Sequence, residues 1–419
     1  MNNKINTIFL CAIFYSGFVT NFVTLSNVNT GTILIDLFMI IYLLIFCVKR
    51  YNSKKFFLNY GLIILIIILI SIFLFKFIID KTSIEYKIQN IHNMLFYLLI
   101  FVWVQATLNS KEEIKKMILS IRLLGVLLSG FAIIQYLFRN ILPIKFLVLN
   151  QDKIFSYIGT DFIRVNGLIG NTIVFGTFSL IIYSLNLNIL LRKINAKNYI
   201  LTFISIISTI LSFSRVAIIG MIVLSAFYIM FFKKNIKIMI AFIVMLILGI
   251  LVLNIGFKNV LTFMVNDVFT NSNISVKGST DKHFNQIQLA MEYIKNNWFI
   301  GSGLGANEGS FYGNIIIYDG AWYSLLLDYG LVLFIPYVCF IFYSMIFSIK
   351  LINKNIGEYS SALVITYIGI SFWVLIIGFI NSSFLAKVVY LTFWLIFGCV
   401  ISIHRKFEMD KKLYRKTWK

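Results

Sequence analysis

The chain repeats one pattern along most of its length: runs of about 20 apolar residues alternate with polar connections. A helix of roughly 20 residues, rising 1.5 Å per residue, is what crosses about 30 Å of bilayer hydrocarbon. Hydrophobic residues make up 60% of the sequence and charged residues only 13%, well below the roughly 25% usual in a soluble domain. Because a water-soluble fold could not hide so much apolar surface, the sequence predicts an all-helical integral membrane protein.

The length of each apolar run predicts about twelve transmembrane helices. We expect the first, Ile5–Leu25, to be retained rather than cleaved as a signal peptide, because polar residues interrupt its end and no A-x-A-like site follows. The predicted spans lie near residues 5–25, 31–48, 56–79, 91–108, 117–138, 167–191, 198–214, 216–232, 236–256, 331–349, 359–380 and 388–404.

Basic residues are concentrated in every second connection between the predicted spans, near residues 49–55, 111–116, 192–197 and 233–237, and in the tail at 405–419. Such connections face the cytoplasm by the positive-inside rule, so both termini are predicted to be cytoplasmic. The net charge of +21 is therefore explained by membrane topology. It does not indicate a nucleic-acid partner.

The predicted topology divides the chain into four segments. Residues 1–256 form an N-terminal membrane bundle of about nine spans, 257–330 a large outer loop, 331–404 the C-terminal spans and 405–419 a basic cytoplasmic tail. Within the outer loop, apolar residues at helical spacing predict a helix over Asp281–Trp298. Because the largest polar segment faces outside, we expect the functional site on that side of the membrane.

Arg215 is the most informative single residue, because it lies between two predicted spans that leave almost no room for a loop. The apolar part of the first span, Tyr199–Leu211, reaches only about 20 Å. Arg215 should therefore lie at or just below the outer lipid boundary, where an arginine needs a wet cavity or an anion. Ser212 and Ser214 add polar groups to the same turn. The alternative is a snorkelling arginine in the headgroup layer.

A second arginine, Arg164, precedes the predicted span that starts near Gly167. Asn166, Gly170 and Asn171 follow it, and such small and polar residues let a backbone or a ligand come close. The planar guanidinium group suits a pair of phosphate oxygens better than a lysine ammonium does. We therefore regard Arg164, Asn166 and Asn171 as candidate ligand contacts, with ordinary interfacial anchoring of Arg164 as the alternative.

The end of the outer loop is rich in glycine and aromatic residues. Gly301, Gly303 and Gly305 could expose backbone N–H groups to an anion or a sugar, although their spacing matches neither a Walker loop nor a Rossmann fingerprint. Trp322 and Tyr323 are either part of an interfacial aromatic belt or a surface on which sugars stack. The candidate substrate-binding residues of the loop are therefore Gly303, Gly305, Trp322 and Tyr323.

A general base for a sugar hydroxyl would come from the few outer carboxylates or from a histidine. Asp319 and Glu308 lie in the most polar and Gly-rich context, although Asp319 could equally be a helix N-cap. His283 could be a base, a phosphate partner or a solvated helix residue. The histidines and cysteines are scattered, so no zinc site and no disulfide are predicted. Arg122 and Lys76, near span ends, are expected to snorkel.

These features resemble the O-antigen polymerase and O-antigen ligase group of membrane glycosyltransferases, which includes the Wzy-type polymerases. The shared features are a short outer hairpin that ends in Ser214 and Arg215, and an upstream arginine, Arg164, before Asn and Gly. The large outer loop completes the match, with a helix, the sequence W-F-I-G-S-G-L-G and a segment that ends in Y-G. The resemblance covers the layout of nearly the whole chain.

The resemblance implies metal-independent glycosyl transfer at the outer face of the bacterial cytoplasmic membrane, without a cofactor. The substrates would be undecaprenyl-pyrophosphate-linked oligosaccharides, and Arg164 and Arg215 would hold the pyrophosphate leaving group. The bilayer and a chain-length regulator are the other implied partners.

The ligase branch of this group usually has a histidine where this chain has Asp319. This difference favours a polymerase of O-antigen or capsule repeat units over an O-antigen ligase. A flippase or transporter of lipid-linked sugars is the remaining alternative, although the sequence shows no clear repeated halves or midplane charges.

Overall fold

The structure is a computed structural model, and it describes five stretches of the chain and three single residues. These are residues 60–80, 100–138 (without 102 and 106), 164–231 (without 170), 274–303 and 320–417, and residues 41, 84 and 87. All regular secondary structure within these residues is helical, and no strand occurs among them. The predicted spans near 5–25 and 236–256 lie outside the described residues.

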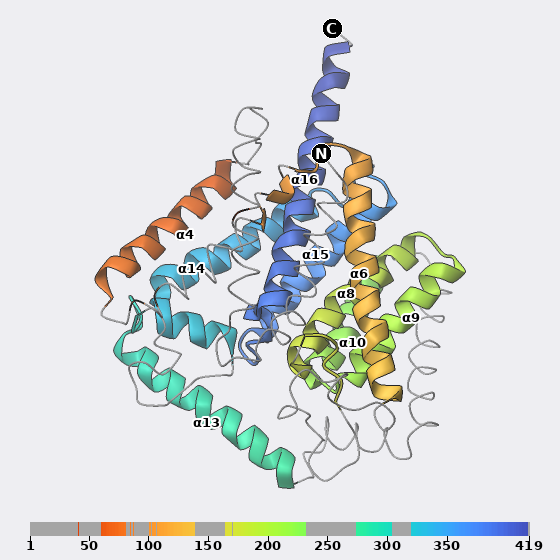
Figure 1. Ribbon diagram of the computed structural model, residues 1–419. Coiled ribbons are helices and arrows are strands. Elements are labelled where there is room, and N and C mark those ends of the chain that lie inside the picture. Colours follow the sequence, from red (N-terminus) through yellow and green to blue (C-terminus); the bar gives the residue numbers. More distant parts are fainter. Residues whose placement is uncertain are drawn as a thin grey trace. The chain divides into compact units, whose positions relative to one another are not determined.

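Residues 41, 84 and 87 and the described residues from 100 to 107 are helical, and the described part of the chain gives the bounds of nine further α-helices and one 3-10 helix. They are α4 (Tyr60–Ile79), α6 (Lys111–Leu137), α8 (Thr172–Arg192), α9 (Ala196–Leu211), α10 (Arg215–Phe231), α13 (Ile274–Asn296), α14 (Ala321–Ile349), α15 (Glu358–Ile377), η4 (Ser383–Leu385) and α16 (Lys387–Thr417). Figure 1 shows their arrangement.

Five of these helices are long and apolar enough to cross a membrane: α6, α8, α14, α15 and the part of α16 up to Lys411. Shorter apolar stretches occur in α4, α9 and α10. The prediction of an all-helical protein with several membrane spans is thus confirmed for the described residues. The total of about twelve spans and the cytoplasmic termini stay predictions.

The predicted loop helix over Asp281–Trp298 is present as α13, which begins earlier, at Ile274. The span predicted to begin at residue 331 is part of a longer helix, α14, which begins at Ala321. Gly330 interrupts α14 with φ 64° and ψ −169°, and the helix bends there (Figure 1). A helix of nine residues therefore precedes the predicted span and is joined to it through this glycine.

The described contacts divide the chain into two compact units. The first contains Met1–Tyr42, Lys115–Ser279 and Gly357–Ile370, and the second contains Leu43–Ile114, Thr280–Ile356 and Ser371–Lys419. Most of α6 and all of α8, α9 and α10 lie in the first unit. The second unit holds α4, most of α13, α14 and α16.

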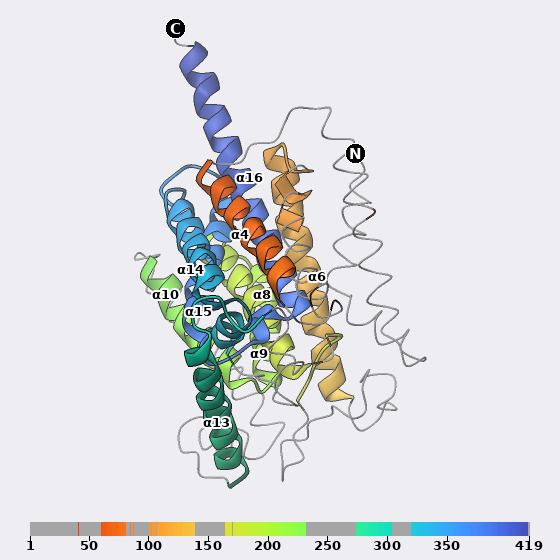
Figure 2. The same cartoon turned by 90° about the vertical axis from the view of Figure 1, so that its left-hand side faces the viewer.

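In the first unit, α8 packs against both α9 and α10, and the three helices stay side by side in both views (Figures 1 and 2). Hydroxyl groups join α8 to α9: Ser179 is hydrogen-bonded to Ser208 at 2.6 Å and to Thr209 at 2.9 Å. Nearly every residue of α8 is buried. These side-chain hydrogen bonds satisfy polar groups that neither protein interior nor lipid would otherwise solvate.

Arg122 of α6 is part of the same polar interior. Its side chain is only 3% exposed, and its Nε donates to the Asn186 Oδ1 of α8 at 2.6 Å. Asn186 in turn donates from Nδ2 to Ser205 Oγ at 2.7 Å. The expectation that Arg122 snorkels to the membrane surface is therefore wrong, because its side chain is buried and its guanidinium group donates to Asn186 inside the protein.

The second unit has an aromatic core. Phe101 stacks on Phe397 with ring centroids 4.8 Å apart, and Trp394 and Phe340 complete the cluster. The end of α13 packs beside the first part of α14, where Ala290 and Ile294 contact Leu327 (Figures 1 and 2).

Candidate functional site

The turn between α9 and α10 carries the predicted Ser-Arg motif of the first unit. The Ser214 N–H donates to the Ser212 hydroxyl at 3.2 Å, and Phe213 adopts the left-handed conformation with φ 47°. The Ser214 hydroxyl accepts from the Ala217 N–H at 3.4 Å and so caps the start of α10. These contacts fix Arg215 as the first residue of α10, where its side chain is half-buried.

Gly176 of α8 allows this turn to lie close against the neighbouring helix. A Cβ atom at Gly176 would lie 2.7 Å from both the Ser212 Oγ and the Ser214 Cβ. Both distances are shorter than ordinary van der Waals contact. The approach of α8 thus depends on the absence of a side chain at this position.

Arg164 lies against the same turn. The backbone before α8 pairs with the end of α9, where the Val165 N–H donates to the Leu211 carbonyl at 3.2 Å. The Arg164 Nε donates to the Ser212 carbonyl at 3.2 Å. Two arginines that are 51 positions apart in the sequence are therefore connected through one short turn.

Asn166 is held in place by a residue that the sequence analysis did not single out. Gln135 of α6 donates from Nε2 to the Asn166 Oδ1 at 2.9 Å and accepts the Gly167 N–H at 3.1 Å. Asn166 is 3% exposed and Gln135 4%. Asn166 and Gln135 thus hold the backbone that follows Arg164, and the substrate contact proposed for Asn166 stays a prediction.

Asn171 begins α8 as its N-cap. Its side-chain oxygen accepts from the N–H groups of Ile173 and Val174, at 2.9 Å and 3.1 Å. An asparagine in this position satisfies N–H groups that have no partner within the helix. The predicted contact between Asn171 and substrate stays a prediction, but its amide oxygen already has a structural role.

The electrostatics of the turn favour an anion. Arg215 stands at the N-terminus of α10, which is the positive end of the helix macrodipole, and the first turn of α10 has no acidic residue. A helix N-terminus combined with two arginines has the charge and the hydrogen-bond donors that bind phosphate groups.

In the second unit, the Gly-rich segment after α13 packs against the interruption in α14. The Ser302 N–H donates to the Leu327 carbonyl at 2.7 Å, and the Gly303 N–H donates to the Asp328 carbonyl at 3.2 Å. A Cβ at Gly301 would lie 2.5 Å from the backbone nitrogen of Gly330. Only glycine allows the two backbones to come this close.

The expectation that these glycine N–H groups face an anion or a sugar is wrong for two of the three residues. The Gly301 N–H donates to the Asn297 carbonyl at 2.8 Å, and the Gly303 N–H is bound as described above. Gly305 lies outside the described residues. The motif therefore builds a close backbone contact between α13 and α14, and any substrate contact of Gly303 would have to use other atoms.

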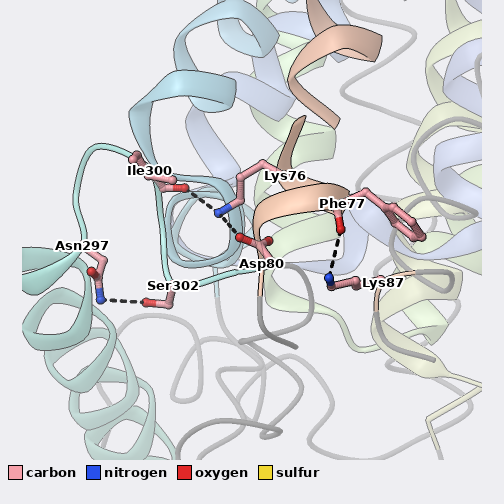
Figure 3. A network of polar contacts seen from close by, with 7 residues as sticks. All are labelled: Lys76, Phe77, Asp80, Lys87, Asn297, Ile300 and Ser302. Atoms are coloured by element: carbon pink, nitrogen blue, oxygen red, sulfur yellow. Dashed lines mark hydrogen bonds and ion pairs between the residues drawn. The ribbon is translucent and has the colours of Figure 1, made fainter. Parts of the chain in front are cut away.

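Lys76, at the end of α4, binds the backbone directly before the Gly-rich segment. Its ammonium lies 2.9 Å from the Asp80 carboxylate and donates to the Ile300 carbonyl at 2.8 Å (Figure 3). The side chains of Lys76 and Asp80 are 1% and 7% exposed. The expected snorkelling of Lys76 is thus also wrong, since both its charge and its N–H groups have partners inside the protein.

The two candidate aromatic residues differ in exposure. Trp322 is 1% exposed, its indole N–H donates to the Leu375 carbonyl at 3.1 Å, and rings of Phe334, Tyr337 and Phe379 surround it. Trp322 therefore belongs to the core and is accessible neither to a sugar nor to the membrane interface. Tyr323 is half-buried and contacts the edge of Phe379.

The candidate general bases are not placed by the structure. Asp319 and Glu308 lie outside the described residues, and His283 lies in the backbone of α13, where its side chain is not described. Among the described residues, no group of three or more histidine, cysteine, aspartate or glutamate side chains could hold a metal ion.

The sequence of the chain was compared with known protein families and with curated proteins. No curated protein gives a significant match to the chain. Residues 200–338 match the family model described as O-antigen ligase. The match covers most of α9, the turn with Arg215, α13, the Gly-rich segment and the first part of α14. This match supports the resemblance to the O-antigen polymerase and ligase group that the motifs around Arg215 and the Gly-rich segment indicate; Arg164 lies outside the matched residues.

Proposed function

We propose that this protein polymerises undecaprenyl-pyrophosphate-linked oligosaccharide repeat units at the outer face of the cytoplasmic membrane. The observation that carries the proposal is the connection of Arg164 to the turn that presents Arg215 at the N-terminus of α10. This arrangement gathers positive charge that the first turn of α10 does not balance with an acidic side chain. A pyrophosphate leaving group has the complementary charge.

The proposed reaction is a glycosyl transfer. A sugar hydroxyl of the next repeat unit attacks the anomeric carbon of the growing chain, and the bond between that carbon and the pyrophosphate oxygen breaks. Undecaprenyl pyrophosphate leaves with the electron pair of the broken bond, and Arg164 and Arg215 stabilise its charge. The proton of the attacking hydroxyl passes to a general base, for which Asp319, Glu308 and His283 are the candidates.

Some of the substrate contacts proposed from the sequence are accessible in the structure, whereas others have structural roles. Tyr323 keeps a partly exposed ring that can face a sugar, whereas Trp322 is buried in the core. Asn166 and Asn171 act first on the backbone next to Arg164. Accordingly, Tyr323 and Gly305 remain the proposed sugar contacts of the outer loop, and Gly303 fixes the backbone that leads to Gly305 against α14.

The second candidate function is that of an O-antigen ligase, which moves a finished chain to a different acceptor. The observation in its favour is the family model itself, whose description is O-antigen ligase. Both reactions release the same lipid pyrophosphate, so the two arginines would serve either one. The acceptor distinguishes the two functions.

The test is complementation of a deletion strain, with the surface polysaccharide resolved on a gel and the membrane level of each variant measured by immunoblot. Wild type should restore a ladder of repeats, whereas Arg164→Ala and Arg215→Ala should leave a single capped unit. Lys197→Ala, at an exposed position of α9, is the matched control and should restore the ladder.

The accumulated intermediate decides between the candidates. If the deletion strain accumulates long lipid-linked chains that never reach their final acceptor, the protein is a ligase. If the repeat units stay on the cytoplasmic leaflet, the protein is a transporter and the glycosyl-transfer proposal is wrong.

A further inference from the structure

Three consecutive large apolar side chains follow the polar helix α13. Trp298 and Phe299 are each 55% exposed and Ile300 is 47% exposed. In the last turns of α13 the exposed side chains are mixed: Glu292 and Lys295 are charged, whereas Leu289 and Met291 are apolar. The exposed surface therefore changes from mixed to wholly apolar at Trp298, and an apolar patch of this kind marks a binding surface.

The backbone of this apolar segment is fixed to the start of the second part of α14. The Leu331 N–H donates to the Trp298 carbonyl at 3.0 Å, and the Val332 N–H donates to the Phe299 carbonyl at 3.1 Å. These contacts lie directly after Gly330, where the membrane span predicted over residues 331–349 begins. The segment thus lies level with one end of a membrane-crossing helix.

A second attachment joins the segment to the end of α4. The buried Lys76 donates to the Ile300 carbonyl, and Asp80 holds the Lys76 ammonium (Figure 3). The last turn of α4 exposes only apolar side chains of large size, with Ile78 79% and Ile79 50% exposed. A helix whose exposed side is apolar faces lipid. The attachment therefore places the backbone of Ile300 beside the last turn of α4, whose exposed side chains are apolar.

We infer that Trp298, Phe299 and Ile300 insert into the interfacial layer of the bilayer and anchor the outer loop to the membrane surface. The occupant of the patch is bilayer lipid, because the patch is attached to the end of α4 and to the start of the second part of α14, at the level where two apolar helices end. Tryptophan is enriched at this depth, where its ring meets the acyl chains and its N–H meets the headgroups. The inference rests on these contacts and is independent of the proposed reaction.

The anchor has a consequence for the loop. Trp298, Phe299 and Ile300 stand between α13 and the Gly-rich segment, which begins at Gly301. Anchoring them holds the start of the Gly-rich segment at the membrane surface, which is where the pyrophosphate of a lipid-linked molecule also lies. A loop without the anchor would be free to move away from that plane.

The test places a nitroxide spin label on single-cysteine variants of a chain in which Cys11, Cys47, Cys339 and Cys399 are replaced. The purified full-length protein is reconstituted into vesicles of phosphatidylethanolamine and phosphatidylglycerol, which contain no polyprenyl lipid. Collision with oxygen, which concentrates in lipid, is compared with collision with a water-soluble nickel chelate. The labelled variants are Phe299→Cys and Trp298→Cys, with Ile78→Cys as the lipid reference and Glu292→Cys as the water reference.

Labels at both 298 and 299 should give a ratio of oxygen to nickel collision that is several-fold above that of the label at 292 and close to that of the label at 78. A ratio equal to that at 292 would overturn the inference, because the patch would then face water. Shielding of both labels from both reagents would also overturn it, since protein from the same chain or a second copy would then cover the patch. Using two positions keeps the test valid if one variant does not fold.

Discussion

The buried ion pair of Lys76 and Asp80 allows a quantitative test of the structure. The charged atoms lie 2.9 Å apart, and both side chains are almost completely buried. Asp80→Asn would leave the Lys76 ammonium buried without its carboxylate. Removing one partner of a buried pair costs about 3–5 kcal/mol, whereas replacing both partners with uncharged groups of similar volume is often neutral or stabilising by about 1–4 kcal/mol.

Asp80→Asn, Lys76→Met and the variant that carries both substitutions therefore form a double-mutant cycle. Asp80→Asn and Lys76→Met should each lower the free energy of unfolding by about 3–5 kcal/mol. Lys76→Met also removes the hydrogen bond to the Ile300 carbonyl, which adds about 1 kcal/mol. The double variant should recover most of the loss, because no unpaired charge remains inside the protein.

The measurement is unfolding of the purified protein in detergent by titration with a denaturing detergent, followed by intrinsic fluorescence. Lys87→Met is the matched control, because the half-buried Lys87 also donates to a carbonyl, that of Phe77, at 2.9 Å (Figure 3). It should cost about 1 kcal/mol. Additive losses in the double variant would refute the reasoning, since they would mean that Lys76 and Asp80 do not interact in the folded protein.

Two further predictions concern the first unit. In the complementation assay, Gly176→Ala should reduce polymer formation although the variant reaches a normal level in the membrane, because its Cβ would displace the turn before Arg215. Gly130→Ala is the control and should have no effect, because a Cβ there meets nothing within 4 Å. Arg122→Met should lower the free energy of unfolding by about 1–3 kcal/mol by leaving the buried Asn186 oxygen without its donor. Adding Asn186→Leu should recover part of that loss in the same detergent titration, and a larger loss in the double variant would contradict this explanation.

The sequence predicted the features of this fold that depend on local pattern. Long apolar runs predict membrane helices, and the helical spacing of apolar residues predicted α13. The N-cap role of Asn171 was not predicted, because the span was expected to start near Gly167, although an asparagine directly before an apolar helix is a common start signal. The connection of Arg164 to the turn before Arg215 agrees with the resemblance to the O-antigen group.

Features that depend on distant partners could not be predicted. Nothing local to Gly303 shows that its N–H meets the carbonyl of Asp328, and nothing local to Trp322 distinguishes a buried ring from an interfacial one. The position of Gln135 against Asn166 likewise follows only from tertiary packing. The ion pair of Lys76 could have been predicted from the sequence, because Asp80 lies four residues after it, which is the spacing of ion pairs on a helix.

The most direct test of the central claim is the binding of a lipid pyrophosphate by the two arginines. Farnesyl pyrophosphate serves as the probe, and its affinity for the purified full-length protein in detergent is measured by calorimetry, with farnesol as the uncharged control. Each charge-assisted contact contributes about 1.5–3 kcal/mol. Arg164→Ala and Arg215→Ala should therefore each weaken binding of the pyrophosphate about 10- to 150-fold, whereas Lys197→Ala should leave it unchanged. Equal affinity in wild type and both arginine variants would contradict the proposed pyrophosphate site.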